Sequence, residues 1–266
     1  MVLDQKKVMW IKELPQNFKE CKSFDKDVVF LWKSDVRPIY ISDNHLTAAW
    51  CWLQECNPNE HYNFMHIDRH GDLKGCGHPH LIDFIKDNPK LSFDDFLKIK
   101  YSNGNIYQFF QWDNYIRACH YLFPEWFNTN YFYVHEFLSA NENGWGYKDF
   151  PFKKRSALNV REDLSQFLEE ANPNMGDGPI GDMWDKPWII NLDLDFFWDE
   201  NKVKIFDEQF IRDFARRINR SMGSIKVLTI ALSPDCVAGK SMSQKWDNVL
   251  EILNIFQEEL QLSIKL

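Results

Sequence analysis

The sequence has no surplus of positive charge and no long apolar run, and each absence removes a class of function. Its 266 residues carry a formal net charge of −8, whereas a surface that binds nucleic acid needs a basic patch to displace the counterions of the phosphates. No run approaches the roughly 18 apolar residues that a membrane-spanning helix requires. Neither nucleic acid nor a membrane is therefore expected as a partner.

The six cysteines show neither CxxC pairing nor the spacing of a zinc knuckle. The first residues, MVLDQKKVMW, have no apolar stretch like that of a signal peptide, so reduced thiols and a cytoplasmic location are expected. Internal repeats, low-complexity tracts and flexible linkers are also missing. Residues 1–266 are therefore taken as a single catalytic domain, and the sequence marks no surface for self-association.

Short apolar segments alternate with helical patterns along the chain. Strands are expected at Val28–Trp32, Pro38–Ile41, Asn63–Ile67, Tyr131–Val134, Trp188–Leu192 and Ile225–Leu232. Helices are expected at His45–Leu53, Gln108–Tyr121, Glu208–Asn219 and Ser243–Gln261, and after Ser92, which has capping-box spacing. Strands that are apolar on both faces are typical of parallel strands covered by helices on both sides. The sequence thus predicts a three-layer α/β/α fold with a mostly parallel central sheet.

Two acidic runs stand out, each directly after a strand-like segment. DRHGD at 68–72 follows Asn63–Ile67, and DLD at 193–195 follows Trp188–Leu192. Because alternate residues of an extended chain point to the same side, each run can present its ligands on one face. The ligands are Asp68, His70, Asp72, Asp193 and Asp195. Four carboxylates and an imidazole carry more charge than an apolar core tolerates without cations, which indicates a metal centre.

The order of these motifs resembles the ureohydrolases, a family that includes arginase and agmatinase and is related in fold to the histone deacetylases. Arginases carry Asp-x-His-x-Asp after one strand, Asp-x-Asp after a later strand, and a further histidine upstream of both. Here His45 follows the strand Pro38–Ile41 at a similar separation from Asp68, although the glycines of the family are absent. The resemblance runs from about His45 to Asp235 and implies an arginase- and deacetylase-like fold.

The resemblance also implies a binuclear manganese site. Six residues would form it, with His45 and Asp72 on one ion, His70 and Asp195 on the other, and Asp68 and Asp193 bridging both. Carboxylate oxygens with few imidazoles and no thiolates suit Mn²⁺ better than a structural zinc ion. In such a site a hydroxide that bridges the two ions attacks the guanidinium carbon of the substrate.

Three further histidines are candidates for catalysis. Arginases place a proton-transferring histidine in a loop after the first motif, where this chain has His78 and His80. Either could instead be an ordinary exposed loop residue. His135 closes the strand Tyr131–Val134, at a strand end where groups that contact substrate are expected.

Two acidic residues are candidates for substrate binding. Glu136 follows His135 at the same strand end. Asp235 follows Ile225–Leu232 and resembles in position the arginase glutamate that pairs with the guanidinium group, for which a carboxylate is a planar, bidentate acceptor. A turn aspartate after a proline is the alternative. His66 lies on the ligand-bearing face of its strand, and it either orients a metal ligand or is a core histidine with satisfied hydrogen bonds.

Departures from the enzymes of free arginine indicate the substrate. Those enzymes recognise the amino-acid end with small polar residues beyond the first motif, where this chain has Leu73 and Lys74. Loops around Trp145 and Trp184 could accept an extended peptide. The motifs look closest to the peptide arginases, which convert arginine side chains of ribosomally made precursor peptides to ornithine and release urea. The resemblance thus implies an arginine-containing precursor peptide as partner.

Other functions remain open on the sequence alone. A hydrolase of a free guanidino metabolite would use the same chemistry, and an amide hydrolase of the deacetylase type usually needs one zinc ion, whereas six ligands favour two. A metallophosphoesterase should have its Asn-His pair downstream of Asp-x-His, but Asn44-His45 comes first. A peptide-binding module that keeps a metal for stability would release no urea.

Overall fold

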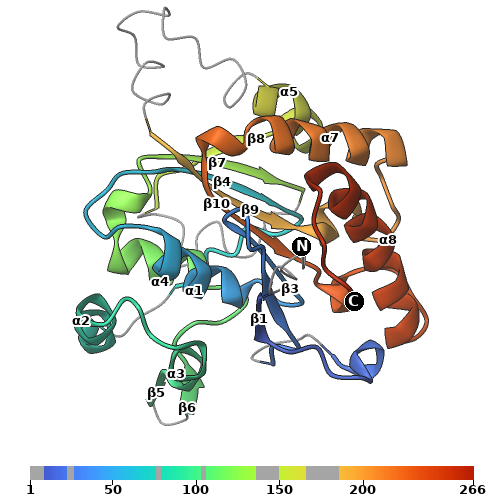
Figure 1. Ribbon diagram of the computed structural model, residues 1–266. Helices are drawn as coiled ribbons and strands as arrows, with labels where there is room; N and C mark the ends of the chain where they lie inside the picture. The colour runs from blue at the N-terminus through green and yellow to red at the C-terminus, as the bar shows by residue number, and fades with distance from the viewer. Residues whose placement is uncertain (1–8, 23–26, 76–78, 103–105, 136–149, 166–185) are drawn as a thin grey trace, which may run out of the picture.

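An eight-stranded sheet forms the centre of the protein in a computed structural model that describes residues 9–22, 27–75, 79–102, 106–135, 150–165 and 186–266 (Figure 1). The strands are β1 (Met9–Lys12), β2 (Leu31–Lys33), β3 (Ile39–Ser42), β4 (Asn63–Asp68), β7 (Thr129–Val134), β8 (Lys153–Arg155), β9 (Trp188–Asp193) and β10 (Ile225–Ala231). They lie in the order β1-β2-β3-β10-β9-β4-β7-β8. Every pair from β3 to β8 is parallel, and only β2 runs against its neighbours. The predicted mostly parallel sheet is confirmed.

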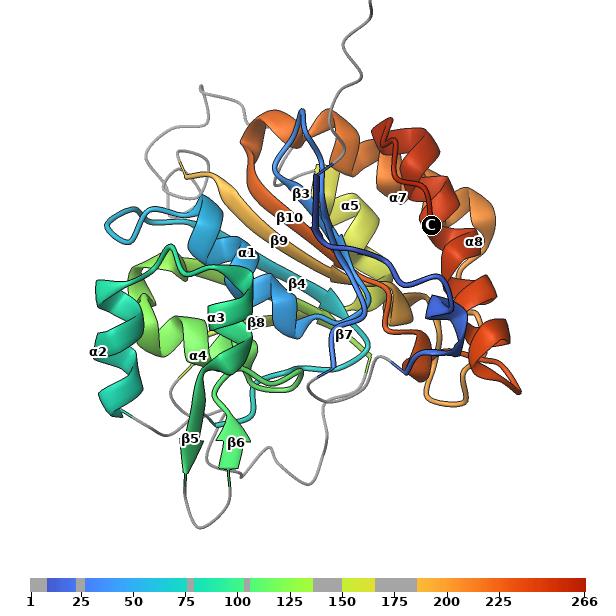
Figure 2. The ribbon, with the colours of Figure 1, turned by 60° about the horizontal axis from the view of Figure 1, so that its bottom comes forward.

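Helices cover both faces of the sheet (Figure 2). One face carries α5 (Val160–Leu164), α7 (Glu208–Arg220) and α8 (Met242–Leu260), and the other carries α1 (Leu46–Glu55), α2 (Pro79–Asp87), α3 (Phe93–Lys98) and α4 (Tyr115–Leu122). Successive side chains of a strand point to opposite faces of the sheet, so the strands contribute to two hydrophobic cores. Met65 packs toward α7 and α8, and Phe64 packs toward α1 and α4. The three predicted layers are therefore present.

Capping side chains fix where several helices begin. Ser92 accepts a hydrogen bond from the backbone N–H of Asp95 at 3.2 Å, which confirms the predicted start of α3. Asp207 accepts from the N–H of Phe210 at 2.7 Å at the start of α7. Each bond satisfies an N–H group that has no partner inside its own helix.

Smaller elements complete the described chain. A hairpin of β5 (Lys100–Ser102) and β6 (Ile106–Gln108) forms a separate two-stranded sheet. Single 3₁₀ turns occur at η1 (Phe18–Glu20), η2 (Pro124–Trp126), η3 (Ala157–Asn159), η5 (Leu194–Phe197), η6 (Met222–Ser224) and η7 (Pro234–Cys236). Two of these turns, η5 and η7, follow the central strands β9 and β10 and contribute to the site described below.

The predicted helix Gln108–Tyr121 was wrong in its first half. Gln108 closes β6, and α4 begins only at Tyr115. The side chain of Asn114 accepts the N–H of Gln111 at 2.8 Å, and this local bond holds the chain in a turn before the helix. Asparagine side chains favour such turns because they compete with the backbone for hydrogen bonds.

The first predicted strand, Val28–Trp32, was also wrong in its range. Only Leu31–Lys33 forms β2, and it is antiparallel to β3. The carboxylate of Asp43 accepts the N–H groups of Val29 and Phe30 at 2.8 and 2.9 Å. These two N–H groups therefore do not bond to a neighbouring strand, and β2 starts after them.

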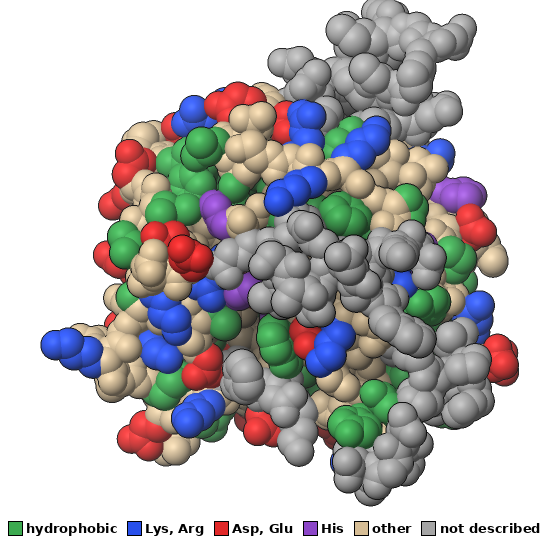
Figure 3. All heavy atoms as spheres, turned by 180° about the vertical axis from the view of Figure 1, so that it is seen from behind, with side chains coloured by type: hydrophobic (Ala, Val, Ile, Leu, Met, Phe, Trp, Pro, Cys, Tyr) green, Lys and Arg blue, Asp and Glu red, His purple; other side chains and the backbone are tan. Residues whose placement is uncertain are grey.

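The described surface carries mixed charge. On the face that Figure 3 shows, the described Lys and Arg side chains are interspersed with Asp and Glu. None of the described helices is long and apolar enough to cross a membrane. The five described cysteines are free thiols.

The parallel register brings the carboxyl ends of the central strands to one edge. Ala231 at the end of β10 pairs with Ser42 on one side and with Asp193 on the other. Asp68 at the end of β4 pairs with Val134 at the end of β7. Loops that follow these strands must therefore meet, and in open α/β sheets this edge is where ligands bind.

Candidate metal centre

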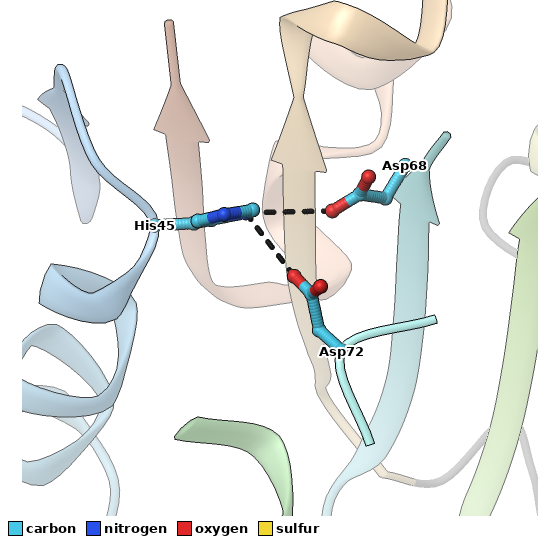
Figure 4. Close-up of side chains that lie close together, drawn as sticks. All are labelled: His45, Asp68 and Asp72. Carbon is cyan, nitrogen blue, oxygen red and sulfur yellow. Dashed lines mark ion pairs between the residues drawn. The ribbon is translucent and has the colours of Figure 1, made fainter. Parts of the chain in front are cut away.

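Acidic and histidine side chains from three loops converge on Asp68 at the end of β4. His45 comes from the loop between β3 and α1, Asp72 from the loop after β4, and Asp193 and Asp195 from the end of β9 and the turn η5. All five are buried. His45 points directly toward Asp68 and Asp72 (Figure 4). The loops thus bring together residues that are far apart in the sequence.

The first half of the centre surrounds His45. Its Nδ1 atom lies 3.4 Å from Oδ2 of Asp68, 3.2 Å from Oδ2 of Asp72 and 2.8 Å from Oδ2 of Asp193. The ligand atoms of His45, Asp68 and Asp72 all lie within 4.8 Å of one another, close enough to hold one metal ion.

The second half surrounds His70 and uses the other oxygen of Asp68. Nδ1 of His70 lies 3.5 Å from Oδ1 of Asp68 and 3.2 Å from Oδ2 of Asp195. Asp68, His70 and Asp195 form a second group of ligand atoms within 4.8 Å of one another. The two groups share one carboxylate, which is the arrangement that two neighbouring ions with a bridging ligand require.

Several atoms of the centre are buried without a hydrogen-bond partner. They are Nδ1 of His45 and the Oδ2 atoms of Asp68, Asp72 and Asp195. Buried polar atoms are otherwise almost always hydrogen-bonded, because leaving one unpaired costs about 1–3 kcal/mol. Four such atoms within the two ligand groups fit cations that bind there, and imidazole nitrogen with carboxylate oxygen suits Mn²⁺.

Backbone N–H groups fix the two carboxylates that follow the strands. Asp68 accepts the N–H of His70 on Oδ1 at 2.7 Å, and Asp193 accepts the N–H of Asp195 on Oδ1 at 3.0 Å. Ser233 adds its hydroxyl to Oδ2 of Asp193 at 2.6 Å. Asp68 is thus held through one oxygen and Asp193 through both, and these bonds fix the direction of the two carboxylates.

Two residues of the centre have left-handed backbone conformations that side chains other than glycine rarely adopt. Asp72 has φ +46° and Ser233 has φ +42°. Such conformations cost of order 1–3 kcal/mol each and persist where the surrounding structure enforces them, often at functional sites. At Asp72 the turn brings the carboxylate back toward His45.

The centre is short of positive charge. Burial, together with the charges of Asp193 and Asp68, raises the pKa of Asp195 to about 7, and burial, with the charge of Asp68 adding to it, raises the pKa of Asp72 well above its ordinary value. Burial opposes the charging of His45, but the carboxylates of Asp72 and Asp193 outweigh it and raise its pKa well above 6.5. These raised pKa values reflect an excess of buried negative charge, which divalent cations would neutralise.

A buried polar network lies beneath the ligands. Asn191 donates from its amide to Nδ1 of His66 at 3.0 Å and to the hydroxyl of Tyr115 at 2.7 Å, and its oxygen accepts from Thr229 at 2.9 Å. With Nδ1 of His66 accepting, Nε2 carries the proton and donates to the backbone carbonyl of His70 at 3.0 Å. Of the two roles expected for His66, the structure favours orientation of a ligand-bearing loop.

Arg69 connects the second half of the centre to two neighbouring loops. It is buried, and one guanidinium nitrogen donates to the carbonyls of Asp199 and Cys236 at 3.2 and 2.9 Å. The remaining nitrogens face His70 and Asp195.

His135, a predicted catalytic residue, lies beside the centre, next to the turn that carries Asp195. Its Nε2 donates to the carbonyl of Phe196 at 2.9 Å, and its ring packs on Phe196 and Phe206. Asp235, predicted to bind substrate, is half-buried in η7, where the ammonium groups of Lys202 and Lys245 donate to its backbone carbonyl at 3.1 and 3.3 Å. The roles of both residues stay predictions.

The other predicted residues lie outside what the structure describes. His78, Glu136, Trp145 and Trp184 belong to segments outside the described residues. His80 lies in the first turn of α2, but its side chain is outside the description.

The sequence analysis missed four residues of the site, namely Arg69, Tyr115, Asn191 and Ser233. For Asn191 a signal existed, since it lies two residues before Asp193 and therefore on the same strand face. Ser233 and Tyr115 come from distant segments and reach the centre only through the fold. Arg69 is inside the first motif, where alternation predicts that its side chain points away from the ligands, but its guanidinium group lies within 3.3 Å of His70.

No known protein family matches the sequence, and no curated protein matches it either. Two solved structures are similar to the chain. One is the agmatine ureohydrolase of Thermoplasma volcanium, with 15% identity, a TM-score of 0.44 and coverage of 85% of this chain and 64% of that one. The other is the arginase of Helicobacter pylori, with 11% identity, a TM-score of 0.46 and coverage of 86% and 73%. This chain thus spans less than two thirds of the agmatine ureohydrolase, and the chemistry of its centre is inferred from its own geometry.

Proposed function

We propose that the protein is a Mn²⁺-dependent hydrolase of the guanidino group that acts on arginine side chains within a peptide. The observation that carries this proposal is the pair of ligand groups that share Asp68. His45 and Asp72 would hold one ion and His70 and Asp195 the other, while Asp193 lies 2.8 Å from His45 and would join Asp68 as a bridge.

The chain itself supplies a rigid and partly dry setting for this chemistry. When two divalent ions are bound, they supply a water nucleophile that is deprotonated near neutral pH. The backbone N–H groups of His70 and Asp195 and the hydroxyl of Ser233 hold the carboxylates in place. Preorganised ligands of this kind need no rearrangement during the reaction.

His135 is the candidate for proton transfer whose position the structure describes. It follows Val134, the residue paired with Asp68 across β4 and β7. Its Nε2 donates to the carbonyl of Phe196, which leaves Nδ1 as the basic nitrogen of the neutral ring. A histidine in this state can accept a proton or, when charged, pass one to the leaving amine.

The residues just beyond the first motif support a substrate whose amino-acid end is not recognised there. Leu73 is buried in the core beneath α1 and α4. Lys74 is exposed and pairs with Asp113 at 2.9 Å. Neither is one of the small polar side chains that recognise the end groups of free arginine, which favours an arginine whose end groups are part of a peptide backbone.

A groove beside the centre supports the same substrate class. It has a volume of about 510 Å³, and Val134, His135, Arg155, Leu158 and Ile205 are among the residues that line it. Leu158 and Ile205 are 69% and 41% exposed and give this groove apolar surface. The groove begins one strand away from Asp68 and could hold the residues that flank a target arginine.

The test compares free L-arginine with an arginine-containing peptide, using Mn²⁺-loaded protein. Water adds to the guanidinium carbon and the bond to the side-chain nitrogen breaks, so the products are urea and an ornithine residue. Mass spectrometry should show a loss of about 42 Da from the peptide, together with urea. Asp193→Ala should abolish both signals, whereas Asp213→Ala, at an acidic residue on α7 outside the centre, should leave them unchanged.

The outcomes separate the alternatives. Turnover of free arginine but not of the peptide would identify a hydrolase of a free guanidino metabolite. Metal binding without urea from either substrate would favour a metal-stabilised binding module. Leu158→Asp should raise the KM for the peptide by about tenfold, the effect of losing one apolar contact, and leave kcat nearly unchanged.

A further inference from the structure

We propose that Arg69 makes the two ion positions unequal, so that the His45 position fills first and the His70 position fills only at higher metal concentration. This inference rests on the proposed function, because it concerns how the same centre takes up its ions. It assigns to Arg69 a positioning and electrostatic role rather than a catalytic one.

The guanidinium group of Arg69 is held in place on its far side. One nitrogen donates to the carbonyl of Asp199 at 3.2 Å and to the carbonyl of Cys236 at 2.9 Å. These two carbonyls belong to the loops after β9 and β10, and the side chain is buried between them. Arg69 therefore cannot swing away without losing both hydrogen bonds.

On its near side, the same group faces the second half of the centre. Its nitrogens lie 3.3 and 3.2 Å from Nε2 of His70, and one of them is 3.8 Å from Oδ2 of Asp195. A guanidinium group keeps its charge at all ordinary pH values. A fixed positive charge therefore stands against any cation that His70 and Asp195 would bind.

The first half of the centre has neutral neighbours instead. The ring of His45 is stacked on Trp112, with centroids 6.4 Å apart, and lies 5.4 Å from the ring of Tyr115. Among the described residues, the ion pairs of His45 and Asp72 are all with other members of the centre. No lysine or arginine of the described chain offsets their charge in the way that Arg69 offsets Asp195.

The expected effect is large enough to measure. A divalent ion and a unit charge about 6 Å apart, partly screened, change an affinity by roughly 10- to 100-fold. Arg69→Met should therefore tighten the second Mn²⁺-binding step by about tenfold or more. The first step should change by much less, because His45 and Asp72 do not contact Arg69.

The experiment is a titration of the metal-free full-length protein with Mn²⁺, followed by calorimetry and by electron paramagnetic resonance. An isolated ion gives its own spectrum in the first step, and a coupled pair appears in the second. Because two neighbouring ions repel each other in any such centre, stepwise loading alone is not diagnostic. The order of filling is assigned with Asp72→Asn, which should remove the tight step, and Asp195→Asn, which should remove the weak one.

Arg37→Met is the matched control. Arg37 also bridges segments, since it donates to the side chain of Asn219 and to the carbonyl of Leu260, but it lies at the start of β3, on the opposite edge of the sheet. It should change neither step. Arg69→Lys keeps the positive charge, so the difference in affinity between the two Mn²⁺-binding steps should remain even if the Tm falls.

Each outcome has a defined meaning. A second step that tightens in Arg69→Met, or a second ion that binds only in that variant, supports the proposal. Equal steps in the wild type, an unchanged second step in Arg69→Met, or a tight step lost in Asp195→Asn overturns it. If Arg69→Met does not fold, the two aspartate variants still decide the order of filling. Absence of any bound Mn²⁺ in the wild type would instead refute the proposed function itself.

Discussion

The two faces of strand β9 differ in what holds them in place. Ile190 and Leu192 point toward α7 and α8 and are surrounded by apolar side chains. Asn191 and Asp193, one residue along from each, point to the other face and make hydrogen bonds with residues from β4, β10, α4 and the loop before η7. The same strand thus supports a core on one side and the candidate metal centre on the other.

This difference shows how the site depends on the fold. Apolar packing is non-directional and scales with the area removed from water, so the Ile190 face tolerates any side chain of suitable size. On the Asn191 face, every buried donor and acceptor needs a partner in the right direction, and each partner comes from a different element. Changes on the first face should therefore alter stability, and changes on the second should alter metal binding.

The sharpest test of this contrast begins with Ile190→Ala. Removing a fully buried side chain leaves a cavity, so we expect a loss of about 2–5 kcal/mol in the free energy of unfolding. Denaturant unfolding of the metal-free protein would measure it. Mn²⁺ affinity, measured well below the Tm, should stay within about threefold of the wild type, since the side chain of Ile190 points to the face away from the centre. A larger change would contradict the separation of the two faces.

Asn191→Leu, at the next residue, should have the opposite profile. Leucine fills the volume but leaves His66, Tyr115 and Thr229 without their partner, so the loop carrying His70 loses its support. Loss of residues that orient metal ligands typically weakens binding by about 10- to 100-fold. Calorimetric titration with Mn²⁺ measures this effect. An affinity equal to that of Ile190→Ala would show that the network has no role in the centre.

The pH dependence of the metal-free protein offers a third test. The pKa of Asp195 in the folded state is about 7, above its ordinary 3.8, so the folded state binds this proton more tightly than the unfolded state does. Stability linked to Asp195 is therefore greatest at low pH and falls as the pH rises from about 4 to 7. Asp195→Asn should remove this loss and raise the Tm of the metal-free protein at pH 8 by roughly 2–4 °C relative to the wild type.

The control for this test is the same pair of proteins at pH 5, where the difference in Tm should shrink because Asp195 is already protonated in the wild type. Adding Mn²⁺ at pH 8 should reverse the order, since only the wild type keeps both ion positions. Equal differences at both pH values would mean that repulsion among the carboxylates is not what the substitution relieves.

Thr229→Val should give the smallest effect. It removes one hydroxyl that donates to Asn191 at 2.9 Å and leaves the rest of the network intact. One net hydrogen bond contributes about 0.5–1.5 kcal/mol, so the Tm should fall by a few degrees and Mn²⁺ affinity should change only slightly. A loss of affinity as large as in Asn191→Leu would place Thr229 at the centre of the network rather than at its edge.

Local sequence was enough to predict the central strands. β4, β9 and β10 lie within one residue of the predicted ranges, because continuous apolar runs bounded by polar residues have few alternatives. The prediction was wrong where short polar bonds override the pattern, as with Asn114 before α4 and Asp43 beside β2. Those bonds depend on residues that no periodicity marks.

In the candidate centre, too, some residues could be predicted from the sequence and others could not. Its six candidate ligands stand in short motifs directly after strands, and the parallel register brings these residues together. Arg69, Tyr115 and Ser233 carry no comparable signal. Their part in the centre comes from contacts between segments that are distant in the sequence.

The sequence by itself determined the layers of the fold, the central strands and the choice of candidate ligands, because these follow from local periodicity and from the chemistry of short motifs. Only the tertiary structure decided that Asp68 is shared by two groups, that Asn191 and His66 support one loop, and that a single arginine faces one half of the centre. The physical reason is that hydrogen bonds and charges act over a few ångströms in space, whereas sequence patterns report only neighbours along the chain.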